Sequence, residues 1–226
     1  NYTPRYEVGG FFKNLDNDLV HTDEFNLYTQ VENTLNYTKS FGKHYVNALA
    51  GYTVYNNGFK SVVSSVSGIP DDIYVLAGAV QPAVTGYNLE NNLVSYLGRA
   101  IYSYDNKYTL SATIRRDGSS RFSPENKWGN FPSVSAAWGL GKETFFTNLN
   151  TPITDLKLRA SYGVLGNQEI GDYQYLGLIT SGISYGVGEP NTLWSGNIQT
   201  NSPGVGLKWE STETADFGLD LDLWNG

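Results

Sequence analysis

The sequence predicts an all-β protein, an antiparallel up-and-down transmembrane β-barrel segment of about seven strands. Several stretches alternate apolar and polar residues with a period of two, which puts the two kinds on opposite faces of a strand. Aromatic residues make up 14% of the 226 residues, and there are 25 glycines, which suits long strands joined by tight turns. Short and long connections alternate along the chain. This is typical of an up-and-down barrel, which has short turns on one rim and long loops on the other.

The first three predicted strands cover residues 25–38, 44–55 and 93–104. In the first, one face carries the apolar residues Phe25, Leu27, Val31, Leu35 and Tyr37. The second strand follows the first after only a few residues. The third ends at Asp105-Asn106, a pair that is typical of tight turns.

The last four predicted strands cover residues 107–115, 131–140, 156–164 and 208–223. The alternation is unbroken in the third of them, where the apolar members are Leu156, Leu158, Ala160, Tyr162 and Val164. Strands in soluble domains usually have about 5 or 6 residues, whereas a tilted strand needs about 9 to 11 to cross a bilayer. Most of the predicted strands fit the longer figure.

Three long connections, at about 56–92, 118–130 and 166–206, hold most of the glycine, proline and asparagine and are expected to be the outer loops. Residues 142–148 are expected to form a helical turn. Aromatic residues lie near strand ends and small alanines at mid-strand, as where strand ends meet a membrane interface. A soluble β-sandwich that binds glycans through its loops stays open as the alternative, because alternation with one apolar face is common to both folds.

The composition excludes several classes of function. Fifteen Lys and Arg against 22 Asp and Glu give a formal net charge of −7 at pH 7, which argues against nucleic acid as a partner. The chain has no cysteine, so disulfides, zinc knuckles and thiol nucleophiles are excluded. The longest apolar run, about 73–80, is far shorter than the roughly 20 residues of a membrane-spanning helix.

No motif supports an enzyme, a metal site or a cofactor. Ser184 lies in a G-x-S-x-G pattern that resembles a nucleophile elbow, but both histidines, His21 and His44, precede it and no helical pattern follows. Three alternating residues resemble the start of a calcium loop but lack its glycine and its distal glutamate, namely Asn14, Asp16 and Asp18. We therefore expect neither catalysis nor a bound metal.

Aromatic side chains in the long connections are candidates for ligand contact, because aromatic rings stack on sugar rings and other flat apolar ligands. These candidates are Trp128, Tyr173, Tyr175, Tyr185 and Trp194. The alternative is that they only pack the loops on themselves. If the apolar faces of the strands point to lipid, the opposite faces, with charges of both signs, line a polar and hydrated lumen.

Six stretches carry a resemblance to a known family. They are SFGKHYVNALAG at 40–51, GRAIYSYDNKY at 98–108, ATIRRDGSSRF at 112–122, ENKWGNFPSVS at 125–135, DLKLRASYGVLGNQ at 155–168 and LKWESTETADFGLDL at 207–221. In this order and spacing they resemble the SusC/RagA-like family of TonB-dependent transporters from the outer membrane of Gram-negative Bacteroidetes. The resemblance covers roughly residues 25–226.

The resemblance implies that residues 1–226 are a partial barrel domain of a longer chain, whose barrel of about 22 strands is filled by an N-terminal plug. Seven antiparallel strands alone could not close a barrel, because the first and last would meet in parallel. The family implies uptake of an oligosaccharide or peptide nutrient, with a SusD-like lid lipoprotein as partner and with TonB acting through the missing N-terminal part. It also implies a loop-structuring role for five residues, Arg115, Arg116, Asp117, Arg121 and Asn167.

Overall fold

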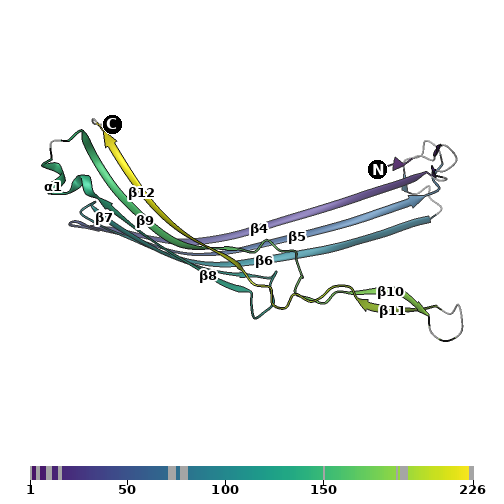
Figure 1. Cartoon of the computed structure of the whole chain (residues 1–226). Coiled ribbons are helices and arrows are strands. Elements are labelled where there is room, and N and C mark those ends of the chain that lie inside the picture. The colour runs from purple at the N-terminus through teal and green to yellow at the C-terminus, as the bar shows by residue number, and fades with distance from the viewer. Residues whose placement is uncertain are drawn as a thin grey trace. The chain divides into compact units, whose positions relative to one another are not determined.

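The computed structural model describes residues 2–3, 6–8, 12–14, 17–70, 75–76, 81–149, 151–186, 188 and 193–223. One sheet contains, in order, β1 (Tyr2–Thr3), β4 (Asp18–Phe41), β5 (His44–Ser67), β6 (Gln81–Tyr104), β7 (Tyr108–Ser119), β8 (Trp128–Gly139), β9 (Ile153–Asn167) and β12 (Glu210–Leu223) (Figure 1). Two separate pairs are β2 (Tyr6–Val8) with β3 (Phe12–Asn14), and β10 (Ile179–Gly186) with β11 (Leu193–Gln199).

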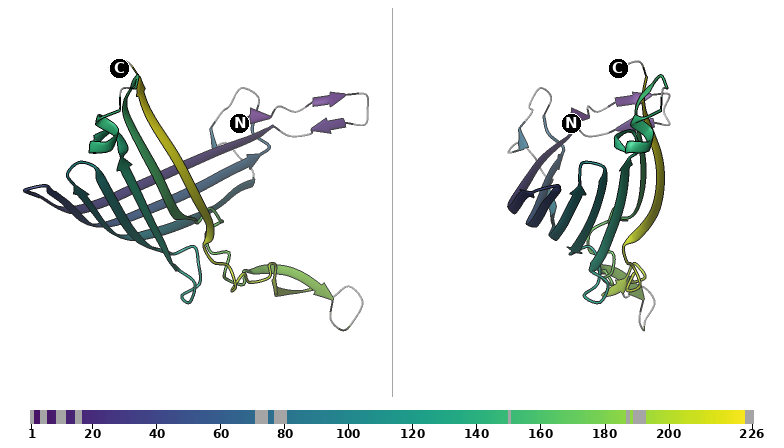
Figure 2. Two further views of the ribbon diagram at one scale, coloured as in Figure 1. Left: turned by 60° about the vertical axis from the view of Figure 1, so that its left-hand side comes forward. Right: turned by 90° about the vertical axis from the view of Figure 1, so that its left-hand side faces the viewer.

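The seven long strands confirm the predicted fold class. A β-sandwich would need two facing sheets, whereas all seven long strands belong to one sheet, in which strands that follow one another along the chain are neighbours (Figure 2). A 3₁₀ turn, η2 (Leu140–Lys142), and a short helix, α1 (Thr144–Thr147), occupy the predicted helical turn between β8 and β9. Neither of these described helices is long and apolar enough to cross a membrane.

The strand boundaries correct the predicted connections. Most of the predicted loop 56–92 is strand, because β5 continues to Ser67 and β6 begins at Gln81. The sequence Asn56-Asn57-Gly58 resembles a turn, but pairing with neighbouring strands overrides this local preference, and Asn56 Nδ2 donates to Glu90 Oε1 at 2.9 Å. The other two connections become 120–127 and 168–209, and the second contains β10 and β11.

The short connections are tight turns, as predicted. Gly42, between β4 and β5, has a φ of +58°. Asp105 and Asn106, between β6 and β7, have φ values of 52° and 53°, which is the type I′ geometry that matches the twist of a hairpin. Lys43 Nζ donates to Asp105 Oδ2 at 2.8 Å, and this hydrogen bond raises the pKa of Lys43 above its ordinary value.

The chain divides into two compact units. In the first, residues 1–29 and 56–91, the buried side chains include Val66 and Ile69, and Asn17 Nδ2 donates to the carbonyl oxygen of Ile69 at 3.1 Å. The second unit, residues 30–55 and 92–226, contains β7–β12 and the connection 168–209. Its buried apolar side chains include Phe122 and Phe131.

Candidate functional site: two faces of a sheet and a long connection

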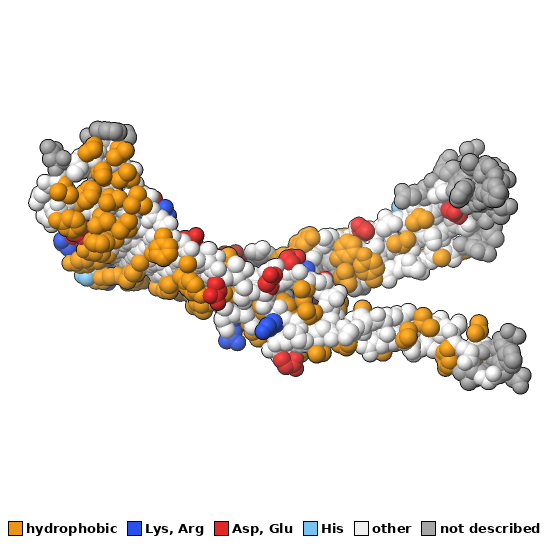
Figure 3. All heavy atoms as spheres, viewed as in Figure 1, with side chains coloured by type: hydrophobic (Ala, Val, Ile, Leu, Met, Phe, Trp, Pro, Cys, Tyr) orange, Lys and Arg blue, Asp and Glu red, His pale blue; other side chains and the backbone are white. Residues whose placement is uncertain are grey.

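One face of the sheet in the second unit is apolar. The registers of β6–β9 and β12 place same-face residues of neighbouring strands in rows. Two adjacent rows are Tyr102, Leu110, Ala136, Ala160, Phe217 and then Ala100, Ala112, Val134, Tyr162, Ala215. Hydrophobic side chains gather over the part of the sheet that Figure 1 labels α1, β9 and β12 (Figure 3). A continuous apolar face of this extent is suited to contact with acyl chains.

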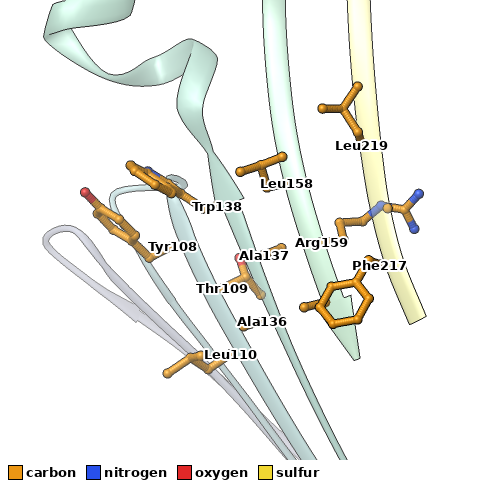
Figure 4. A pocket seen from close by; sticks show the side chains of 12 residues that line it. Tyr108, Thr109, Leu110, Ala136, Ala137, Trp138, Leu158, Arg159, Phe217 and Leu219 are labelled. Carbon is orange, nitrogen blue, oxygen red and sulfur yellow. The ribbon is translucent and has the colours of Figure 1, made fainter. Parts of the chain in front are cut away.

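Aromatic side chains form a belt at each end of this apolar face. At the short-turn end, Tyr108 stacks on Trp138 with ring centroids 6.3 Å apart (Figure 4). The aromatic side chains at the other end form what we call the outer belt. There the ring centroid of Tyr96 lies 6.1 Å from that of Trp128 and 5.2 Å from that of Tyr52. Trp128 and Trp138 are about ten residues apart on β8, or roughly 34 Å along the strand and 26 Å after a tilt of about 40°. The apolar band of a transmembrane barrel is about 25 Å tall.

The opposite face of the same strands is polar. One row of this face contains Ser111, Ser135, Ser161 and Asp216. In the neighbouring part of the face, Arg159 Nη2 donates to Asp220 Oδ1 at 2.8 Å. Charges of both signs and hydroxyl groups on one face are typical of a wall that meets water.

A hydrogen-bonded cluster joins the β8–β9 connection to the short-turn end of the sheet. Glu143, between η2 and α1, accepts hydrogen bonds from Trp138 Nε1 at 3.1 Å, from Lys107 Nζ at 3.2 Å and from the hydroxyl of Tyr108. The hydrogen bond from Tyr108, followed by that from Trp138, holds the pKa of Glu143 below its ordinary value of 4.5. The Glu143 carboxylate therefore orients both aromatic rings of the short-turn belt.

At the other end of the sheet, the connection 168–209 is held to the β7–β8 connection. Arg121 Nε donates to Asp172 Oδ1 at 2.9 Å, and both side chains are largely buried, at 18% and 11% exposed. Asn126 Nδ2 donates to the carbonyl oxygen of Val205 at 3.2 Å. We call these four residues the clasp. A charge-assisted hydrogen bond that is sheltered from water holds better than an ion pair at the surface.

Three aromatic rings pack beside the clasp residues. The Trp209 ring lies 5.3 Å from the Phe122 ring and meets the Phe131 ring edge-on at 5.2 Å. Phe122 and Phe131 are only 2% and 7% exposed. Gly166 makes room for this cluster, because a Cβ atom at that position would collide with the Phe131 ring. The three rings therefore pack against β8 and β9 where the connection leaves the sheet.

Within the connection, β10 and β11 form a hairpin with an aromatic face. Gly182, with a φ of +82°, is an extra residue that shifts the register of the pair. This β-bulge turns Ile183 and Tyr185 onto the face that carries Trp194 and Ile198. Tyr185 lies directly opposite Trp194, and the two side chains are 49% and 57% exposed. The two exposed rings therefore lie side by side, where a ligand could stack on both of them.

The five predicted ligand-contact aromatics separate into three places. Tyr185 and Trp194 come together in the hairpin, whereas Tyr173 and Tyr175 are half-buried in the part of the connection that precedes it. Trp128 does not lie in a loop, because it is the first residue of β8 and belongs to the outer belt. The apolar residues Ile183 and Ile198 of the same face were not predicted, although the alternation over 183–185 indicates a strand there.

Four of the five predicted loop-structuring residues bond close to the loop ends. Arg115 Nε donates to both carboxylate oxygens of Asp117 at 2.8 Å, and Arg121 lies in the clasp. Asn167 Nδ2 donates to Glu210 Oε2 at 3.0 Å, and Asn167 Oδ1 accepts from the backbone N–H of Glu169 at 2.9 Å. The fifth residue, Arg116, lies on the opposite face of β7 from Arg115.

The residues considered for catalysis or metal binding do not form a site in the described part of the chain. Ser184 lies opposite Ser195 in the hairpin, whereas His44 shares a hydrogen bond of 2.8 Å with the Tyr102 hydroxyl. No group of three or more His, Asp or Glu among the described residues could hold a metal ion. Of the possible calcium ligands, the side chain of Asn14 and all of Asp16 lie outside the described residues.

No family model matches the chain. It is 40% identical over 201 residues to TonB-dependent receptor P3 of Formosa agariphila, covering 87% of this chain and 20% of the relative. It is 35% identical over 208 residues to TonB-dependent receptor SusC of Bacteroides thetaiotaomicron, covering 89% of this chain and 19% of the relative. The chain therefore spans about a fifth of the length of the curated relatives it matches.

Solved structures agree with the fold. A structure of the RagAB peptide transporter matches with a TM-score of 0.81 at 24% identity, over 93% of this chain and 23% of that chain. The RagAB peptide importer in its open-open state matches with a TM-score of 0.78 at 25% identity, over the same shares. Together with the identity to the curated relatives, this assigns the sheet to part of a barrel. The chain belongs to the SusC/RagA-like family of TonB-dependent receptors of the outer membrane.

Proposed function

We propose that the complete protein is an active importer that carries an oligomeric nutrient, a glycan or a peptide, across the outer membrane. The observation that carries this proposal is the sheet with one apolar face between two aromatic belts and one polar face. The first face fits lipid and the second fits a hydrated lumen. The family of the chain supports energy coupling through TonB and a SusD-like lipoprotein as the lid, both of which would act through parts beyond these strands.

We assign cargo contact to the connection 168–209. The hairpin presents the exposed rings of Tyr185 and Trp194 on one face, and aromatic rings of this kind suit sugars and uncharged peptide side chains. Residues 173–207 contain a single charged residue, Glu189, which lies outside the described residues. A surface so poor in charge favours a neutral cargo. Tyr173 and Tyr175 belong to the same candidate surface, whereas Trp128 is better explained as a belt residue.

Uptake by the full-length protein in its native outer membrane tests this function. We would compare uptake of labelled oligosaccharide and oligopeptide pools with and without a protonophore, in cells that have the gene and in cells that lack it. The proposal expects gene-dependent uptake of one pool that stops when the proton-motive force collapses. Uptake that continues without that force would contradict coupling to TonB, and no gene-dependent uptake of either pool would contradict import.

Two hairpin variants separate cargo contact from import as such. Removing both rings in Tyr185→Ala/Trp194→Ala is expected to weaken uptake about tenfold, since each stacking contact contributes roughly 0.5–1.5 kcal/mol. The matched control is Leu193→Ala, on the other face of the same hairpin and 70% exposed, which should leave uptake unchanged. Equal uptake by the double variant and the wild type would remove the hairpin from the cargo site.

A further inference from the structure

Arg116 is the one cation on the apolar face of β6–β9 and β12, and it has no carboxylate partner among the described residues. Two other arginines of these strands are paired with carboxylates, Arg115 with Asp117 and Arg159 with Asp220. Over the residues that these five strands pair with one another, the only other charge on this face is Glu213, which accepts a hydrogen bond of 2.8 Å from the Tyr162 hydroxyl. A guanidinium group has five N–H donors, and nothing described accepts from those of Arg116.

The guanidinium group of Arg116 is nonetheless held in place. Its Cζ atom lies 5.0 Å from the centroid of the Trp128 ring, a cation–π contact. The Trp128 ring in turn lies flat against Gly118, where a Cβ atom would come within 2.7 Å of it, and stacks with Tyr96. Arg116 is therefore an exposed cation that packs against the aromatic rings of the outer belt.

The neighbours of Arg116 across the strands are also hydrogen-bond donors. Tyr96 lies opposite Arg116 on β6, and Asn130 lies opposite it on β8. Asn130 is exposed, and neither its amide nor the Tyr96 hydroxyl bonds to another described side chain. A phenol, a guanidinium and an amide thus form one row that crosses three strands at the outer belt.

An apolar groove of about 840 Å³ begins some four residues, or roughly 13 Å, along β7 from Arg116. Small side chains form part of its floor, among them Ala112, Ala136 and Ala160. Figure 4 shows the neighbouring part of the same face, where Leu110 and Phe217 stand on either side of Ala136. The distance from the donor row to the groove is about that from a lipid headgroup to the middle of its acyl chain.

The geometry points to a binding site for a lipid with a phosphorylated headgroup, with the phosphate on Arg116 and Asn130 and the acyl chains along the alanine groove. A guanidinium fork binds phosphate in a bidentate manner, and an arginine on the lipid-facing side is tolerated near the interface but is costly at the midplane. The membrane lipid is the occupant because the anion site continues into an apolar groove. This inference goes beyond the proposed function, since it depends on the lipid-facing side of the barrel and not on import.

Native mass spectrometry of the full-length protein tests the site. The protein would be mixed in detergent with diphosphoryl lipid A or with the same lipid after removal of its phosphates, and the retained lipid counted. Wild type should retain the phosphorylated form about fivefold better than Arg116→Gln does, and should retain the dephosphorylated form no better than the variant. Equal retention by Arg116→Gln and wild type, or retention that ignores the phosphates, would overturn the site.

Two further variants guard against misfolding and unspecific binding. Asn130→Asp keeps the size of the side chain but places a negative charge opposite Arg116, so it should lower retention without removing the arginine. Arg159→Gln removes a guanidinium from the polar face and should leave retention unchanged. If Asn130→Asp retained as much phosphorylated lipid as wild type, or if Arg159→Gln lost as much as Arg116→Gln, the proposal would be wrong.

Discussion

The sheet of the second unit and the connection 168–209 are ordered in different ways. In the sheet, β9 and β12 remain in register from Asn167 opposite Glu210 to Leu156 opposite Leu221. In the connection, order depends on side-chain bonds such as those of Arg121 and Asn126, which join residues 51 and 79 positions apart. The sheet is held by a regular ladder of backbone hydrogen bonds, so it tolerates many substitutions on its polar face. The connection is held by a few individual side-chain contacts, so the loss of one of them matters more.

The largest effect is expected where a charge enters the apolar face of the sheet. Val134 and Ser135 are neighbours near the middle of β8, are both exposed, and lie on opposite faces. Val134→Arg should destabilise the full-length protein in bilayers by about 2–4 kcal/mol, because arginine at the midplane of the lipid face costs about that much. Denaturant unfolding in vesicles measures this cost.

Ser135→Arg is the matched control. On the polar face the new guanidinium group meets water, and Asp216 lies two strands away in the same row. We expect a change of less than about 1 kcal/mol. Equal destabilisation by the two variants would show that the faces do not differ in the way that the registers indicate.

The next effect is expected in the connection. Arg121→Ala removes the cation from Asp172, which is only 11% exposed, and should reduce the local stability of the connection by about 1–3 kcal/mol. Limited proteolysis of the full-length protein should then cut within 173–207 faster, while cleavage of the sheet stays slow.

The control for the clasp is Lys43→Ala, which breaks an ion pair in which the Lys43 side chain is 61% exposed. Exposed pairs of this kind contribute little, so the cleavage rate should not change measurably. If Arg121→Ala left cleavage of 173–207 at the wild-type rate, the clasp would not be what orders the connection.

The smallest effect is expected from pH at the short-turn end of the sheet. The folded state lowers the pKa of Glu143, so the hydrogen bonds of Glu143 stabilise the fold above pH 4.5 and are lost as the pH falls through the lower folded value. Glu143→Gln should melt at a lower temperature than wild type at pH 7. The two melting temperatures should converge in acid, and a gap that stayed constant down to pH 3 would contradict the role of the carboxylate.

The strands could be predicted because their signal is local. Ala136 and Trp138 on β8, or Leu158 and Ala160 on β9, repeat with the period of two that a pleated strand imposes. The tight turn at Asp105-Asn106 was equally visible, since these residues tolerate the positive φ that a type I′ turn requires.

Where prediction failed, non-local pairing overrode local chemistry. Residues 128–130, with Gly129, resemble a loop but begin β8, because β7 pairs with them as far as Trp128 opposite Gly118. Pro132 is tolerated since β8 pairs with β9 only from Ser133 onward, so no ladder partner on that side needs its missing N–H. The clasp was visible only in part, because the bond from Asn126 to Val205 spans 79 residues.

One face of β8 is expected to meet lipid and the other to meet water. Single cysteines at positions 132–137, introduced into a full-length protein without other cysteines and spin-labelled in bilayers, test it directly, since this chain has none of its own. Collision rates with oxygen and with a water-soluble nickel chelate should alternate with a period of two. The even positions, including Val134 and Ala136, should favour oxygen and the odd ones should favour nickel. Uniform rates along the strand, or the opposite alternation, would contradict the account.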